Sequence, residues 1–394
     1  MRPIESLPWA IPKRLYLLDG LRGIAALSVV LFHWCHFYLP YNREGIQYIG
    51  EQQPFFDQLS FIYLDGGGAV NLFFCLSGFV FFWLYEKQIT DGAMSFIEFS
   101  LLRFSRLYPL HFATLLLVAY GQAVHVSLTK TVFVYGFNDA YHFLLNLVFA
   151  SAWGFDQVPS FNGPVWSVSI EVLLYGIFFV VCRRGMTRVV VLFALSFGVG
   201  GVVSKFSLPL GNGLACFFVG GLAFRAYAVL VEKKFNNQAL IVALILAFMA
   251  WLLTILGAGD KPQFETGKYD FVPRLFPIYV LYPLTLIATA LAETRWKFGK
   301  RFAWLGDISY SLYLIHFPLQ LAVVILVIRM KVYPGIFYSP IFFVFFVAVL
   351  ILLSFASHRY LEIPAQHWIR ANFAGRGRRL CGFIDLRTKR PGEK

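Results

Sequence analysis

Arg22 and His33 are the two ionisable residues best placed for chemistry in the first apolar stretch of the chain. The stretch from Asp19 to His36 reads DGLRGIAALSVVLFHWCH. The two residues are eleven positions apart, and at about 100° per residue this spacing puts them on one face of a helix, about 16 Å apart along its axis. Ionisable groups inside a hydrophobic helix are rare and usually functional. A histidine there could serve as a general base or as a nucleophile.

A carboxylate and a pair of arginines occur in later apolar segments. Glu171 lies in GPVWSVSIEVLLYG, and Arg103 and Arg106 lie in LLRFSRLYPLH. Arginines three residues apart share a helix face, and their planar guanidinium groups suit phosphate. With Arg22 they could bind phosphate, and ordinary basic flanking of membrane helices is an equal alternative. A carboxylate within a membrane needs a partner, and a purely structural pair that joins two helices is the weaker alternative to a functional one.

Several other polar residues in apolar segments are secondary candidates. His316, in LGDISYSLYLIHFPL, is equally consistent with a structural and a functional role. The glycines at 66–68 are as typical of close helix packing as of a ligand site. The additional site candidates are Asp19, Asn71, Ser77, Trp166, Ser167, Tyr175, Ser311 and His316. Acyl transfer through Cys35 is a weaker alternative, because two residues turn it about 200° away from the face of His33.

The composition is typical of a polytopic membrane protein. Of the 394 residues, 58% are hydrophobic and only 14% are charged, whereas soluble domains are about 25% charged. The net charge of +13 indicates cytosolic loops and contact with anionic lipid, and we do not expect nucleic acid as a partner. The five cysteines show no CxxC pattern, so neither a disulfide framework nor a metal site is indicated.

The distribution of basic residues orients the apolar segments. Eleven such segments lie near 21–39, 66–85, 107–125, 141–155, 164–182, 187–204, 208–230, 238–257, 273–292, 308–328 and 336–357. The clusters of basic residues that follow segment 141–155 in the chain fall on the cytosolic side if this segment does not cross the membrane. At 15 residues, this segment is below the length of about 17–25 residues that a spanning helix needs.

We therefore predict an all-α polytopic membrane protein with about ten transmembrane helices. Segment 141–155 would be a re-entrant or interfacial helix, and both termini would be cytosolic. An eleven-span topology is the main alternative. Residues 1–370 would form the transmembrane domain, and residues 371–394 a basic cytosolic tail suited to the inner leaflet.

This topology places His33 and Glu171 at similar depths in the membrane. His33 would lie about 9 Å from the outer end of its span, and Glu171 about 10 Å from the outer start of its span. The two helices would run antiparallel. Such depths are what a histidine–carboxylate pair requires, although they do not establish that the two helices are neighbours.

Six motifs together resemble the membrane-bound acyltransferase family 3. In order they are LDGLRGIAALSVVLFHW, NLFFCLSGFVFFW, RFSRLYP, GPVWSVSIEVLLY, LGDISYSLYLIHFPL and RYLEIPAQHW. The last is similar to the closing pattern of the family, with Ile363 where a lysine is common. The resemblance covers roughly residues 14–370. It implies a ten-helix enzyme that transfers acyl groups, often acetyl, from cytosolic acyl-CoA to a hydroxyl of a glycan, polysaccharide or small molecule.

The resemblance also assigns expected roles to the five residues identified above. The Arg–ten residues–His motif of the family falls on Arg22 and His33, its Arg–x–x–Arg motif on Arg103 and Arg106, and its glutamate on Glu171. We expect His33 to act as base or nucleophile, Glu171 to orient it, and the arginines to bind the phosphates of acyl-CoA.

The expected location and partners follow from the same resemblance. Acyl-CoA, most simply acetyl-CoA, would be the donor substrate, and no tightly bound cofactor is expected. The other partners would be a glycan or polysaccharide acceptor and membrane lipid, within a bacterial cytoplasmic membrane. The alternative from another class is a transporter or flippase for a lipid-linked sugar or small molecule, because buried His, Glu and Arg also suit a proton-coupled carrier.

Overall fold

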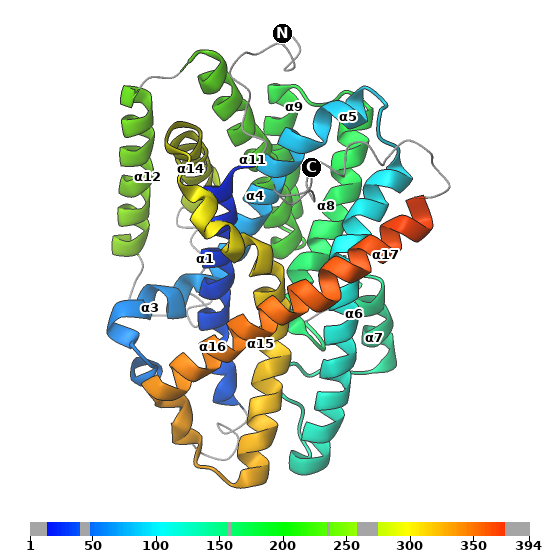
Figure 1. Ribbon diagram of the computed structural model, residues 1–394, viewed down its shortest axis with the longest axis vertical. Coiled ribbons are helices and arrows are strands. Elements are labelled where there is room, and N and C mark those ends of the chain that lie inside the picture. Colours follow the sequence, from blue (N-terminus) through cyan, green and yellow to red (C-terminus); the bar gives the residue numbers. More distant parts are fainter. Residues whose placement is uncertain (1–13, 40–47, 156–158, 235–236, 258–274, 375–394) are drawn as a thin grey trace, which may run out of the picture.

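The computed structural model describes residues 14–39, 48–155, 159–234, 237–257 and 275–374, and the regular elements in these residues are all helical (Figure 1). The first half of the chain forms α1 (Tyr16–Phe32), η2 (His33–Phe37), α3 (Phe56–Asp65), η4 (Gly66–Gly68), α4 (Ala69–Leu84), α5 (Glu86–Thr90), α6 (Phe96–Thr129), α7 (Ala140–Leu147), η5 (Gly163–Val165) and α8 (Trp166–Arg183). The second half forms α9 (Val189–Phe193), η6 (Ala194–Val199), α10 (Gly200–Val203), α11 (Leu208–Glu232), α12 (Asn237–Gly257), η7 (Pro277–Leu281), α14 (Tyr282–Trp296), η8 (Gly299–Phe302), α15 (Ala303–Met330), η9 (Pro334–Tyr338), α16 (Pro340–Ser357), η10 (His358–Glu362) and α17 (Ile363–Ala374).

The helix lengths confirm an all-α polytopic membrane protein. Nine helices among the described residues are long and apolar enough to cross a membrane, and Val189–Val203 is a shorter apolar helix. α7 has eight residues, so it is only about 12 Å long and cannot cross a hydrocarbon core of about 30 Å. This agrees with the prediction that segment 141–155 does not span. Which side of the membrane holds the termini remains a prediction.

Some helices extend beyond the predicted segments. The second span begins at Phe56, because α3 and η4 precede α4, and α6 is 34 residues long. α17 continues to Ala374, so the predicted tail 371–394 starts inside a helix, and its remainder lies outside the described residues. Hydropathy locates the apolar part of each helix, whereas local capping sets its ends. Ser95 and Glu98 form a reciprocal capping box at the start of α6.

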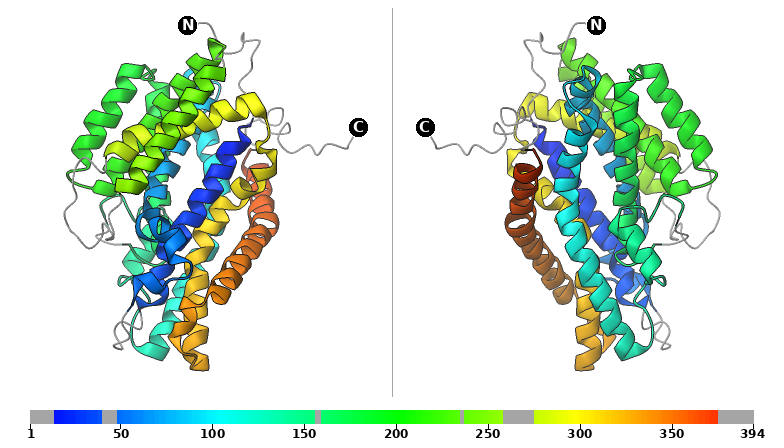
Figure 2. Two further views of the ribbon diagram at one scale, coloured as in Figure 1. Left: turned by 90° about the vertical axis from the view of Figure 1, so that its left-hand side faces the viewer. Right: turned by 90° about the vertical axis from the view of Figure 1, so that its right-hand side faces the viewer.

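α1 lies at the centre of the bundle, between α15 and α4 (Figures 1 and 2). Its contact with α15 depends on glycines. A Cβ added at Gly23 would lie 2.8 Å from the backbone oxygen of Leu305, and one added at Gly306 would lie 2.8 Å from that of Asp19. Small residues allow membrane helices to approach this closely. The first helix is therefore held at a fixed height against α15.

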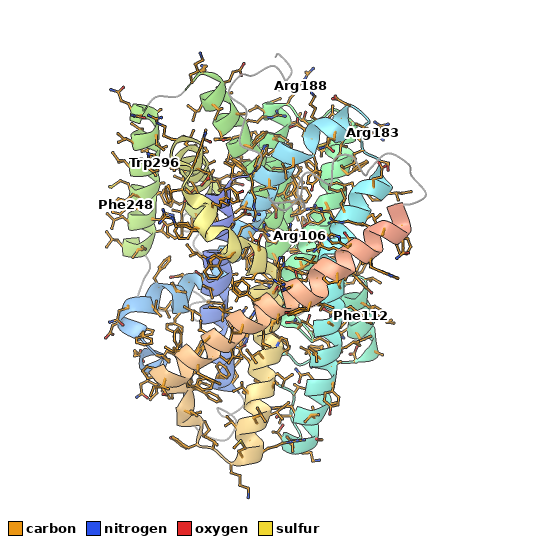
Figure 3. All side chains as sticks on the ribbon, in the orientation of Figure 1. Arg106, Phe112, Arg183, Arg188, Phe248 and Trp296 are labelled. Carbon is orange, nitrogen blue, oxygen red and sulfur yellow. The ribbon has the colours of Figure 1, made fainter. Side chains whose placement is uncertain are left out.

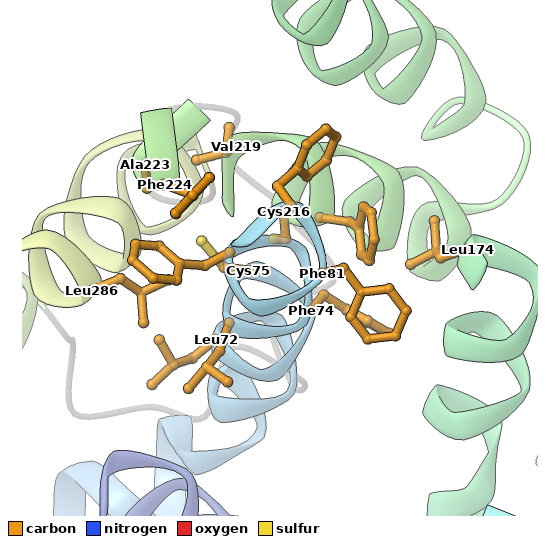
Figure 4. Packing of buried hydrophobic residues seen from close by; sticks show 14 of the residues in the cluster. Leu72, Phe74, Cys75, Phe81, Leu174, Cys216, Val219, Ala223, Phe224 and Leu286 are labelled. Atoms are coloured by element: carbon orange, nitrogen blue, oxygen red, sulfur yellow. The ribbon is translucent and has the colours of Figure 1, made fainter. Parts of the chain in front are cut away.

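The main apolar core lies between α4 and α11 and includes Leu72, Cys75, Phe81, Cys216 and Phe224 (Figure 4). Here too the helices meet through glycines. A Cβ at Gly78 would fall 1.8 Å from the backbone oxygen of Phe217, and a Cβ at Gly220 would fall 1.9 Å from that of Cys75. The glycine at 78 is thus explained by helix packing.

Candidate active site

A cavity among α1, α4, α6, α8 and α15 gathers most of the charged residues that the sequence singled out. Its polar lining consists of Arg22, Ser77, Arg103, Arg106, Ser167, Glu171, Tyr175, Ser309, Tyr310 and Tyr313. Aromatic and aliphatic side chains such as Phe73 and Phe81 complete the wall. The cavity volume is about 100 Å³, which is room for several water molecules. It is smaller than the roughly 300–1,000 Å³ of pockets that enclose whole ligands.

The three arginines of the cavity have few anionic partners. Arg106 makes no hydrogen bond or ion pair with any other described residue. Arg103 donates from Nη2 to the hydroxyl of Tyr85 at 2.6 Å and packs over the ring of Tyr85, while its buried Nε has no partner. Nη1 of Arg22 lies 4.0 Å from Asp19, but Asp19 is also bound by Arg14 at 2.5 Å. The cavity is therefore left with positive charge unpaired.

Glu171 is the carboxylate on the cavity wall. Its Oε1 accepts a hydrogen bond from Ser77 of α4 at 2.7 Å. The guanidinium group of Arg22 and the neutral hydroxyl of Tyr175 are close enough to interact with this carboxylate. One carboxylate against three guanidinium groups leaves a positive surplus, and this surplus favours an anionic ligand.

Arg106 differs in position from the basic residues at the helix ends. Figure 3 shows Arg106 about midway along the long axis of the bundle, whereas Arg183 and Arg188 lie near one end. Ordinary positive flanking places arginines at the helix ends, as for Arg183 and Arg188. The interior position of Arg106, on the wall of a cavity, is instead typical of a functional intramembrane residue.

His33 lies outside this cavity, in a cluster of histidines. Its Nδ1 is 3.0 Å from Nε2 of His316 on α15, and the two rings are stacked with their centroids 5.1 Å apart. His36 stacks on His33 at 4.7 Å. The amide of Gln320 donates to the backbone oxygen of His33 at 2.9 Å. The helix also changes from α to 3₁₀ at His33, so the ring lies where the regular geometry of α1 ends.

Tyr313 joins the cavity to the histidine cluster. Its ring lies on the cavity wall and is 6.0 Å from the ring of His316. Its hydroxyl is 2.7 Å from Oγ of Ser167 and donates to the carbonyl oxygen of Pro164 at 2.8 Å. Any group passing from the arginines toward His33 would therefore meet this side chain.

The predicted site residues fall into three groups. Seven of them line the cavity: Arg22, Arg103, Arg106, Glu171, Ser77, Ser167 and Tyr175. His33 lies outside the cavity and contacts His316. The remaining candidates are not part of the cavity lining. Asp19 forms an ion pair with Arg14, and Ser311 is hydrogen-bonded to Glu362. Trp166 packs on Phe74, and Asn71 lies on α4. The hydrogen bonds of His33 and Glu171 go to His316 and Ser77, so a direct role of Glu171 in orienting His33 stays a prediction.

One site residue, Gln320, was missed by the sequence analysis, which also gave Tyr313 no role. Polar residues are spaced at steps of four, three and four along α15, at Ser309, Tyr313, His316 and Gln320. This spacing forms a single stripe on a helix, and the stripe faces α1, because His316 and Gln320 both bond to His33. The periodicity of polar residues within an apolar helix was the signal that could have found it.

Comparisons with known proteins place the chain in a family of acyltransferases. Residues 15–359 match the acyltransferase 3 family, described as an acyltransferase domain. The chain is 28% identical over 332 residues to Acyltransferase MdmB of Streptomyces mycarofaciens, covering 77% of this chain and 78% of that protein. It is 32% identical over 182 residues to Protein 2 in picA locus of Rhizobium radiobacter, covering 42% of this chain and 82% of that protein. No solved structure matches.

The nine long apolar helices among the described residues define an integral membrane protein. Because the match spans nearly the whole chain, the protein belongs to the acyltransferase 3 family. It is a membrane O-acyltransferase, as the resemblance of its six motifs implied.

Proposed function

We propose that the protein transfers an acyl group, most simply acetyl, from cytosolic acyl-CoA to a hydroxyl of a glycan or polysaccharide. The observation that carries this proposal is the positive surplus of the cavity, where Arg22, Arg103 and Arg106 face a single carboxylate. Buried charges need partners, and the phosphates of CoA would supply them. Arginine forks bind phosphate strongly and with defined geometry.

The size of the cavity sets a condition on donor binding. At about 100 Å³ the cavity admits a phosphate or the end of a pantetheine arm, not an entire acyl-CoA. We therefore expect the phosphates to bind at the arginines and the arm to extend along α1 toward His33. The side chain of Tyr313 lies on this route and would have to move to let the thioester through.

His33 is the proposed base for the transfer. Its Nε2 has no hydrogen-bond partner among the described residues, while Nδ1 contacts His316. Nε2 would take the proton of the acceptor hydroxyl as that oxygen attacks the thioester carbonyl. A C–O bond forms, the C–S bond breaks, and His33 returns the proton to the departing sulfur. CoA leaves as the thiol, and His33 is again neutral.

The location of the donor and the acceptor is part of the proposal. Arg22 and His33 are eleven residues apart, about 16 Å along a helix, or about half of a hydrocarbon core of about 30 Å. A donor held at Arg22 from the cytosolic side could thus meet an acceptor that reaches His33 from the other side. Both relatives are bacterial proteins, which supports a bacterial cytoplasmic membrane.

Removing a cavity arginine should weaken donor binding. Arg103→Ala or Arg106→Ala is expected to raise the KM for acetyl-CoA by about 10- to 100-fold, because hydrogen bonds to a charged group contribute about 1.5–3 kcal/mol. Steady-state kinetics with acetyl-CoA and with acetyl-pantetheine, which lacks the nucleotide phosphates, would measure this effect. The KM for acetyl-pantetheine should change little.

The matched control for this experiment is Arg188→Ala. Arg188 is exposed and lies near the end of the bundle (Figure 3), so its removal should leave both KM values unchanged. An equal effect of all three substitutions would show that the cavity arginines act only as basic flanking residues. A protein that moves a lipid-linked sugar but never releases CoA would instead be the transporter considered from the sequence.

A further inference from the structure

We propose that His316 is a positioning residue that holds His33 in the tautomer required of a base. The contact between Nδ1 of His33 and Nε2 of His316 is 3.0 Å long, and it joins two helices, α1 and α15. His316 is fully buried, with 0% of its surface exposed. This inference rests on the proposed role of His33 and adds a second histidine to it.

The pairing of two imidazoles restricts where their protons can lie. Between two neutral rings, one nitrogen must donate and the other must accept. If Nδ1 of His33 donates, its Nε2 carries a lone pair and is free to take a proton. If Nε2 of His316 donates instead, the neutral His33 ring must carry its proton on Nε2 and cannot act as a base there.

A neutral partner suits a base inside a membrane. When His33 accepts a proton at Nε2, its Nδ1–H still donates to Nε2 of His316, and the positive charge that develops is shared across this hydrogen bond. Nδ1 of His316 then carries the proton of that ring. An anionic partner would add a second charge to be buried, and Glu171, the anionic partner expected from the sequence, bonds to Ser77 instead.

The surroundings of the pair keep its geometry fixed. Gln320, one helical turn beyond His316, donates to the backbone oxygen of His33, and His36 stacks on the face of its ring. The glycine contacts between α1 and α15 set the distance between the two helices. A ring held by a hydrogen bond, a stacked neighbour and a fixed backbone retains the orientation that proton transfer requires.

Replacing His316 with side chains of different lengths tests this role. A glutamine amide reaches about as far as Nε2 of a histidine, whereas an asparagine amide reaches only about as far as Nδ1. His316→Gln can therefore still accept from His33, while His316→Asn and His316→Phe cannot. We expect the asparagine and phenylalanine variants to lose at least about 10-fold in kcat, with an unchanged KM for acetyl-CoA, and the glutamine variant to remain within a few-fold of wild type.

The assay is release of CoA from acetyl-CoA by purified protein, with His33→Gln, His111→Phe and wild type measured in parallel. His111 is a buried histidine that contacts the carbonyl oxygen of Asn146, so its variant reports the general cost of losing a buried imidazole. Equal activity of the glutamine, asparagine and phenylalanine variants of His316, all folded, would overturn the inference. If wild-type protein releases no CoA, the proposed function fails, and the two failures are thereby distinguished.

Discussion

Replacing His33 with glutamine is expected to lower kcat by at least about 100-fold, because general base catalysis contributes about 10²–10⁴ in rate. Glutamine is similar in length to histidine but cannot take up a proton, and the glycine contacts that pack α1 against α15 are untouched by the substitution. The KM for acetyl-CoA should change little, since the arginines that line the cavity are untouched. Initial rates of CoA release at saturating donor would measure the loss.

His111→Gln is the matched control for this substitution. It also replaces a buried histidine with an amide, but its ring contacts the carbonyl oxygen of Asn146, away from the cluster of His33. Its kcat should stay close to that of wild type. Near-normal turnover of a folded His33→Gln variant would rule out His33 as the base.

Replacing Gly220 with alanine is expected to destabilise the protein severely. The added Cβ would lie 1.9 Å from the backbone oxygen of Cys75, a distance that no side-chain rotation can relieve. Overpacking of a core typically costs about 1–3 kcal/mol and sometimes more. Here two backbones would have to separate along the buried contact between α4 and α11. We expect a clear fall in the midpoint of thermal unfolding in detergent, or loss of folded protein altogether.

Gly176→Ala provides the comparison, because a Cβ at Gly176 of α8 would have no neighbour within 4 Å. Alanine is the better helix former by about 0.8–1.0 kcal/mol, so this variant should be as stable as wild type or slightly more stable. An unfolding midpoint for Gly220→Ala equal to that of Gly176→Ala would show that α4 and α11 do not pack as closely as described.

The spans and the charged residues could be predicted from the sequence because each depends on local properties. Apolar length identifies a spanning helix, and an ionisable residue within one is conspicuous whatever surrounds it. The short segment 141–155 could be excluded on the same basis. Its helix, α7, has eight residues.

The partners of these residues could not be predicted, because they depend on which helices are neighbours. Similar depth made a contact between His33 and Glu171 reasonable, yet depth does not determine adjacency. The structure places α15 against α1 through glycines at 23 and 306, so His316 is the side chain that reaches His33. Ser77, from α4, reaches Glu171. The arginine cavity and the histidine cluster are distinct sites because of how the helices pack, and the sequence alone does not specify that packing.

The most direct test follows labelled acetyl groups from acetyl-CoA in membrane vesicles that have their cytosolic face outward. Vesicles containing the protein should release CoA and transfer labelled acetyl groups to a glycan fraction, and Arg106→Ala should require more acetyl-CoA for the same rate. Vesicles containing His33→Gln should transfer almost no label. Undiminished transfer by His33→Gln, or no release of CoA by the wild-type protein, would contradict the proposal that this cavity and histidine cluster catalyse acyl transfer from CoA.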